Sequence, residues 1–187
     1  MPAKSMKNAA EGHKKWTVQL RRRPPSSRTL SNPLWQDGAV KSPEEVAEHH
    51  RRLERLYASA PVTQWYGARI SVADGEAEVL VTVRPEFFHA AGAVHGSVYF
   101  RLLDDAAFFA VNSRVPEVFV LTVSFTVQLA RPVAAGGIRA RGRVRHGGGR
   151  LFFADSELFD DRGQLLGTGS GVFSRSAIPL DARVGYV

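Results

Sequence analysis

Cysteine is absent from this sequence of 187 residues. Its absence excludes disulfide bonds, thiolate metal sites and a cysteine nucleophile, although it does not locate the protein. Long hydrophobic runs are missing as well, since no apolar stretch approaches the ~20 residues that a membrane-spanning helix needs. The N-terminal segment also lacks the apolar core of a secretory signal. We therefore expect a cytoplasmic protein with no membrane span.

Acidic residues are scarce at the start of the chain. Residues 1–36 contain eight lysines and arginines and one acidic residue, Glu11, whereas the rest balances 17 basic against 17 acidic residues. The formal net charge of +7 therefore belongs to the N-terminal segment. Because residues 1–40 show no periodicity, we expect a disordered or loosely docked arm, with a transit peptide as the alternative. Residues 41–187 then form a single domain whose neutral body predicts no nucleic-acid partner.

Helix and strand signals follow one another beyond the arm. Ser42, Pro43 and Glu45 form the capping box and first turn of a helix that should end near residue 58. Asp74 and Gly75 predict the turn of a hairpin. The expected strands are 64–72, 77–83, 118–129, 138–146, 151–159 and 165–174, with a central helix over 96–113. A long apolar helix packed against one antiparallel sheet is an α+β architecture.

The central helix carries two adjacent carboxylates, Asp104 and Asp105, although it is apolar on nearly every side. A buried charge is costly unless it is paired or put to use. Arg101 lies one turn before Asp105 and gives that carboxylate a structural partner. No residue of the helix neutralises Asp104, which is therefore the candidate functional carboxylate. The alternative is that Asp104 accepts hydrogen bonds from sheet backbone or caps a loop.

Gly96 begins the same helix, and an amide at a helix start can stabilise developing negative charge. Gly96 and Asp104 are eight residues apart, roughly 12 Å along the helix axis. One chain cannot easily place both groups on one small reacting centre. A two-fold dimer with antiparallel central helices would bring Gly96 of one chain toward Asp104 of the other. The spacing favours at least a dimer, with sites at its interface for hydrolysis of an acyl compound.

The helix start and the carboxylate together form a motif that resembles the hotdog-fold acyl-CoA thioesterases. The segments that carry the resemblance are His95-Gly96-Ser97, Asp104, 121–125 and 131–133. Within that superfamily the sequence looks most like the PaaI-like branch, the phenylacetyl-CoA and 4-hydroxybenzoyl-CoA thioesterases, over about residues 60–175. The resemblance implies a hotdog fold, in which an antiparallel sheet wraps around a long central helix, here with an extra N-terminal helix.

The resemblance implies that the Gly96 amide polarises a thioester carbonyl and that Asp104 acts as general base or nucleophile. It also implies homodimers, often paired into homotetramers. Two positions depart from the family pattern, because Ser97 replaces a second glycine and His89 replaces an asparagine that positions the carbonyl or water. His89 either substitutes as a hydrogen-bond donor, changes the chemistry or is an ordinary loop residue. His95 is a secondary catalytic candidate.

This interpretation assigns further residues to an acyl-CoA substrate. The hydroxyls of Thr122 and Ser124 would hold the attacking water, and Ser97 would contact the substrate at the helix start. Arg131 and Arg150 are candidates for binding the phosphates of coenzyme A. The acyl chain would lie among the aromatic side chains of the central helix. Because a thiolate is a good leaving group, we expect no metal and no cofactor, coenzyme A being part of the substrate.

Three alternatives to a hydrolase stay open. The same fold could bind acyl-CoA without hydrolysing it, with His89 and Ser97 marking lost chemistry, or could hydrate an enoyl thioester. A protein tethered to nucleic acid by its basic arm is the third. An α/β-hydrolase is not favoured, because the Gly-Thr-Gly-Ser-Gly run at 167–171 misses the spacing of a nucleophile elbow. The three glycines at 147–149 are interpreted as a hairpin turn.

Overall fold

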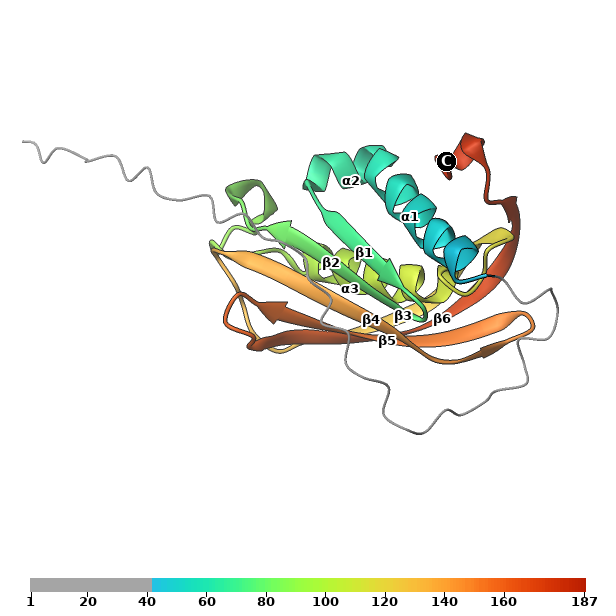
Figure 1. Cartoon of the computed structure of the whole chain (residues 1–187). Helices are drawn as coiled ribbons and strands as arrows, with labels where there is room; N and C mark the ends of the chain where they lie inside the picture. Colours follow the sequence, from blue (N-terminus) through green and yellow to red (C-terminus); the bar gives the residue numbers. More distant parts are fainter. Residues whose placement is uncertain (1–41) are drawn as a thin grey trace, which may run out of the picture. The chain divides into compact units, whose positions relative to one another are not determined.

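The computed structural model describes residues 42–187, so the expected arm at 1–40 lies outside the described residues. The helices are α1 (Pro43–Ser59), α2 (Pro61–Tyr66) and α3 (Gly96–Asn112), with 3-10 turns at Pro85–Phe87 and Ala182–Val184. The strands are β1 (Arg69–Ala73), β2 (Glu76–Thr82), β3 (Val118–Leu129), β4 (Gly137–Gly148), β5 (Leu151–Asp160) and β6 (Leu165–Pro179). They form one antiparallel sheet in the order β1-β2-β4-β5-β6-β3. The predicted α+β architecture is confirmed (Figure 1).

Helix α1 begins as the sequence predicts. The Ser42 side chain accepts a hydrogen bond from the Glu45 amide at 3.2 Å, and the Glu45 carboxylate accepts one from the Ser42 amide at 2.6 Å. These two bonds satisfy amides that a helix start leaves unpaired, so the polar sequence at 42–45 fixes where the helix begins. The described helices include none that is both long and apolar enough to cross a membrane.

Some predicted boundaries were wrong. The expected strand 64–72 begins only at Arg69, because the preceding residues form the short helix α2, with Pro61 at its first position and Gly67 at its end. Two of the three glycines expected in a turn, Gly147 and Gly148, pair with β5 as the last residues of β4. Strand β6 continues five residues beyond its predicted end at 174. Pairing with neighbouring strands decides where these strands begin and end, and the local sequence contains little information about that pairing.

Helix α3 lies against the inner face of the sheet and forms the centre of the core (Figure 1). Leu102, Leu103, Ala106 and Ala110 are fully buried. The sheet approaches the helix closely at Gly142 of β4, where an added Cβ would lie 2.1 Å from the carbonyl oxygen of Ala106. Only glycine permits that approach, which helps the sheet to curve around the helix as predicted.

The two edges of the sheet differ. On β1 the outward amide of Val72 donates a hydrogen bond to Glu54 Oε1 of α1 at 2.9 Å, so α1 closes that edge. Strand β3 forms the other edge and pairs only with β6 within the described chain. Its exposed side chains include Leu121, Val123 and Leu129, and Val123 keeps 60% of its surface exposed. An unpaired edge with apolar side chains is a surface onto which another chain can add.

Candidate functional site

Asp104 is a half-buried residue of α3 on the side that faces the edge strand β3. Its Oδ1 accepts a hydrogen bond from the Thr122 hydroxyl of β3 at 3.1 Å. Burial raises the pKa of Asp104, while the bond from Thr122 and the charge of Arg101 partly offset that effect. A carboxylate with a raised pKa that reaches the surface is suited to exchange protons with water or substrate.

Asp105 points to the other side of α3, toward α1. Its Oδ2 lies 3.1 Å from the Arg101 guanidinium and accepts a hydrogen bond from the Tyr57 hydroxyl at 2.9 Å. Arg101 also donates to the Thr63 hydroxyl at 3.2 Å and lies over the ring of Tyr66. The predicted pairing of Arg101 with Asp105 is therefore confirmed, and the contact with Tyr57 adds a link to α1 that sequence reasoning did not identify.

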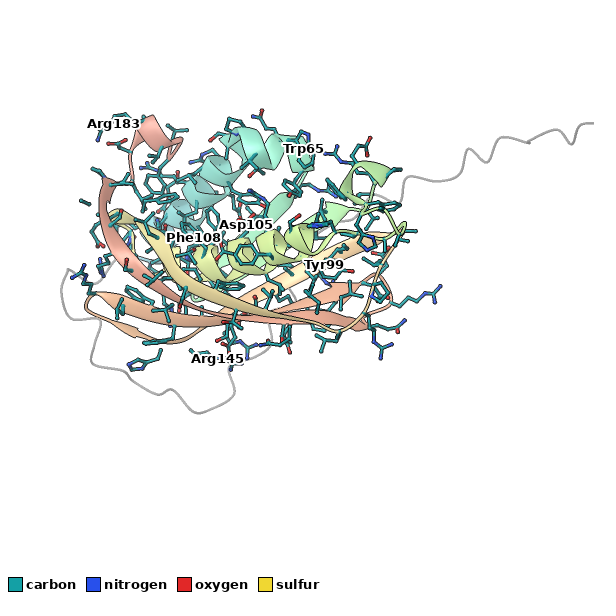
Figure 2. The ribbon with its side chains drawn as sticks, turned by 180° about the vertical axis from the view of Figure 1, so that it is seen from behind. Trp65, Tyr99, Asp105, Phe108, Arg145 and Arg183 are labelled. Carbon is teal, nitrogen blue, oxygen red and sulfur yellow. The ribbon has the colours of Figure 1, made fainter. Side chains whose placement is uncertain are left out.

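Burial is also the main influence on the protonation of Asp105. The pKa of this carboxyl is about 6, because burial and, to a smaller extent, the neighbouring Asp104 raise it more than Arg101 and Tyr57 lower it. Figure 2 shows Asp105 on the side of the sheet that carries the helices, whereas Arg145 lies on the opposite side. The two adjacent aspartates thus have separate environments, and only Asp104 faces the edge strand β3.

The start of α3 is fixed by His95. The Nδ1 atom of His95 accepts a hydrogen bond from the Ser97 amide at 3.1 Å and lies 2.8 Å from the Ser97 hydroxyl. The His95 amide donates to the carbonyl of Phe87 at 2.8 Å, which anchors the turn. Gly96, as the first residue of the helix, contributes an amide without an intrahelical acceptor. Because Nδ1 accepts from backbone, the neutral ring carries its proton on Nε2 and can donate from there.

His89 lies in the loop that leads into this turn. The loop is held by a bridge between Phe88 and Val94 and by the His89 amide, which donates to the Ala93 carbonyl at 2.9 Å. The His89 ring uses Nδ1 to accept from the Ala91 amide at 3.1 Å. Its Nε2 is therefore left as a hydrogen-bond donor when the ring is neutral.

The other predicted substrate contacts are spread along the sheet. Ser124 lies on β3, after a register shift that separates it from Thr122. Arg131 follows the end of β3 and donates to Gln164 at 3.3 Å. Arg150 lies in the β4–β5 turn, where its carbonyl accepts from Arg175, a residue paired with the start of β3. Since β3 spans roughly 40 Å, the two arginines of one chain lie far apart and do not form one phosphate site.

Gly96 and Asp104 both lie on α3, eight residues apart, as the sequence indicated. A hollow of about 370 Å³ lies at the C-terminal segment, lined by residues 177–179, 181, 183 and 184, and none of the predicted site residues borders it. Between residues 42 and 187 no three His, Cys, Asp or Glu side chains are grouped so that they could hold a metal. His49 is buried against the carbonyl of Asn112 and the hydroxyl of Tyr186, which gives it a structural position.

Two phenylalanines extend the surroundings of Asp104: Phe100 belongs to the aromatic side chains of the central helix expected to contact the acyl chain, whereas Phe125 was not assigned from sequence. Phe100, one turn before Asp104 on α3, is exposed and meets the ring of Phe125 edge-on, with centroids 5.7 Å apart. The sequence signal available for Phe100 was its helical spacing from Asp104, whereas the contact with Phe125 depends on where β3 packs.

Comparison with known proteins relates this arrangement to a superfamily. Residues 91–166, which contain α3 and the strands β3, β4 and β5, match the family model of the thioesterase superfamily. None of the curated protein sequences compared with the chain matches it significantly.

Solved structures give the same fold. The PaaI protein from the phenylacetic acid degradation operon of E. coli superposes with a TM-score of 0.66 at 23% identity, covering 72% of this chain and 97% of that chain. A mutant of the phenylacetic acid degradation protein PaaI from Thermus thermophilus is 27% identical, with a TM-score of 0.57 over 63% of this chain and 100% of that chain. A conserved protein from Pseudomonas aeruginosa is 26% identical, with a TM-score of 0.60 over 63% and 94% of the two chains. The predicted hotdog fold and the resemblance to PaaI-like proteins are confirmed.

Proposed function

We propose that this chain, which has the hotdog fold and a central segment of the thioesterase superfamily, hydrolyses an acyl-CoA thioester to a free acid and coenzyme A. The observation that carries the proposal is Asp104. It is a half-buried carboxylate on a largely buried helix, where it accepts a hydrogen bond from Thr122 and where burial raises its pKa. The neighbouring PaaI structures and the superfamily match support a thioester as the substrate class.

The reaction uses groups of α3 from two different copies. Asp104 of one copy takes a proton from water as the water oxygen bonds to the carbonyl carbon of the thioester. The carbonyl oxygen gains negative charge, which the Gly96 amide of a second copy stabilises at its helix start. The carbon–sulfur bond then breaks, the carbonyl reforms, and the thiolate takes the proton from Asp104. The products are the carboxylic acid and the thiol.

The histidines of the loop have supporting roles in this scheme. The Nε2 donor of His89 replaces the amide donor that the resemblance assigns to this position, and it would hold the carbonyl or the attacking water. His95 keeps the Gly96 amide directed outward through its bond with Ser97. Neither role requires an ionised imidazole, because both rings accept backbone hydrogen bonds through Nδ1.

The scheme requires a homodimer, and the open edge of the sheet supports one. Strand β3 carries Thr122 and ends the sheet, with apolar side chains exposed beside the carboxylate. Pairing of two β3 edges would place two α3 helices antiparallel across a two-fold axis and continue the sheet from one copy to the next. Three expectations stay predictions from the sequence. They are the pairing of dimers into a tetramer, the binding of the coenzyme A phosphates by Arg131 or Arg150, and a cytoplasmic location.

The decisive test is a panel of acyl-CoA thioesters with detection of the released thiol. Asp104→Asn should lower kcat/KM at least a hundredfold, because it removes the proton acceptor with little change of shape. Asp155→Asn is the matched control: this partly exposed aspartate of β5 pairs with Arg145, which lies on the side of the sheet opposite the helices (Figure 2). Wild-type protein that binds acyl-CoA without releasing thiol would support the non-hydrolytic binder, and loss of an enoyl group without thiol release would support the hydratase.

A further inference from the structure

The glycines of the 167–171 run have a packing role that their spacing did not reveal. An added Cβ at Gly169 would lie 2.5 Å from Cζ of Phe125, and one at Gly171 would lie 2.4 Å from Cδ2 of the same ring. Such distances are shorter than real contacts, so any side chain at either position displaces the ring. The two glycines therefore form a recess in the inner face of β6, and Phe125 fills it.

The ring in this recess is linked to the candidate site through Phe100. Phe125 contacts the exposed ring of Phe100, and on its other side it lies against Phe173, with centroids 6.2 Å apart. Phe100 precedes Asp104 by one turn of α3, and Thr122, which binds Asp104, precedes Phe125 by three residues on β3. The Phe125 ring thus occupies the space between the sheet and the surface beside the carboxylate.

We propose that Phe125 determines acyl-chain specificity by closing the inner end of the acyl site next to Asp104. This inference rests on the proposed hydrolysis of an acyl-CoA. The ring limits how far an acyl chain can extend past Phe100 toward β6, so the wild-type enzyme prefers short or compact acyl groups. The neighbouring rings are apolar, and they favour an uncharged chain, because an ionised chain end would lose its hydration there.

Two variants alter the recess in opposite directions. Phe125→Ala empties it and should raise kcat/KM for long straight-chain acyl-CoA esters relative to short ones by about tenfold or more, since each methylene accommodated in an apolar pocket is worth roughly that factor. Gly169→Ala pushes the tip of the ring away from the sheet and toward Phe100. Gly169→Ala should lower kcat/KM for long acyl-CoA esters relative to short ones. The acetyl ester should show the smallest loss of kcat/KM.

Matched controls separate specificity from general damage. Phe153→Ala removes an exposed ring from β5, and Ser170→Ala makes a change of similar size on β6 at the exposed position between the two glycines. Both should leave the ratio of long to short esters unchanged. Thermal unfolding is measured for every variant, and Phe125→Leu, which keeps an apolar side chain in the recess, replaces Phe125→Ala if the latter does not fold.

The outcomes distinguish this inference from the proposed function. Suppose that the wild-type enzyme hydrolyses acyl-CoA esters and that Phe125→Ala, Phe125→Leu and Gly169→Ala show the same dependence of kcat/KM on acyl-chain length as the wild type. The role of Phe125 in specificity is then refuted, while the proposed hydrolysis stands. A uniform loss for all esters in these variants refutes it too, because it indicates a structural role. If the wild-type protein hydrolyses no acyl-CoA ester, the proposed function is wrong, and the specificity role is wrong with it.

Discussion

The hydroxyl of Thr122 donates a hydrogen bond to Asp104 across the boundary between β3 and α3, at 3.1 Å. The bond favours the ionised carboxylate and opposes the effect of burial on the pKa of Asp104. Asp104 acts as a proton acceptor only when it is ionised, so kcat/KM should rise with pH through the pKa of this group.

Replacing Thr122 by valine keeps the shape and removes the donor. The pKa of Asp104 should then increase, and the acidic limb of the pH–rate profile should move to higher pH by up to about one unit. Thr122→Ser, which keeps a hydroxyl, should leave the limb nearly in place. The measurement is kcat/KM against pH for all three proteins, and an equal loss of rate at every pH would contradict the assignment.

Asp105 should make folding stability depend on pH. Burial raises its pKa from 3.8 to about 6 in the folded protein, so between those values the folded state holds a proton that the unfolded state has released. The contribution of Asp105 to the free energy of unfolding is therefore largest at low pH and falls, by on the order of 3 kcal/mol, as the pH rises from about 4 to about 6.

Asp105→Asn removes this titration. The variant keeps a polar side chain beside Arg101, and the contact between the two does not change with pH in the variant. Urea unfolding of both proteins from pH 4 to 8 measures the difference in stability, in which the titration of groups that do not interact with Asp105 cancels. The stability of the wild type relative to the variant should decline across the stated range and then level off. A difference that is constant, or that grows with pH, would show that the pKa of Asp105 is not raised.

The helix-start amide can be removed without removing the helix. Proline is favoured at the first position of a helix, and His95 already has the extended backbone, ψ 143°, that a following proline requires. Gly96→Pro should lower kcat by about a hundredfold to a thousandfold, as loss of one oxyanion donor does. Gly96→Ala keeps the amide and brings a methyl group only to the flexible end of Leu129, so its activity should stay close to that of the wild type.

Gly96→Pro also tests whether the site is shared between two copies of the chain. A dimer of one Gly96→Pro chain and one Asp104→Asn chain contains one intact site and one site with both defects. Unfolding and refolding an equal mixture of the two inactive proteins should restore about a quarter of the wild-type activity, because half of randomly formed dimers are mixed. Refolding each variant alone is the control. No recovery in a mixture that forms dimers would place both groups in one chain.

The sequence was most informative where a feature is local. The capping box of Ser42 and Glu45 and the one-turn spacing of Arg101 and Asp105 each depend on residues three or four apart, and the structure confirms both. The last three residues of α2, 64–66, were assigned to a strand because a helix of six residues is too short to show a period.

Long-range contacts account for the rest of what the sequence did not predict. Tyr57 reaches Asp105 over 48 residues, and Phe125 reaches the β6 glycines over more than 40. Neither pair leaves a signal in spacing, because each depends on how separate elements pack. The residues of the central helix identified Asp104 and Gly96 as candidates, and the resemblance supported them. Neither indicated that the alternating glycines of β6 would accommodate the ring of Phe125.

The side chain of Glu54 on the Val72 amide has a consequence for how many copies can assemble through the sheet. A sheet with two free margins can add neighbours without end and grow into a fibre. Here α1 covers the β1 edge of the sheet, so the described part of each molecule offers one edge, β3, for strand addition. Two molecules that pair through β3 leave no such edge free for a third. Exposing the β1 margin by deleting α1 would turn a self-limiting pair into a potential polymer.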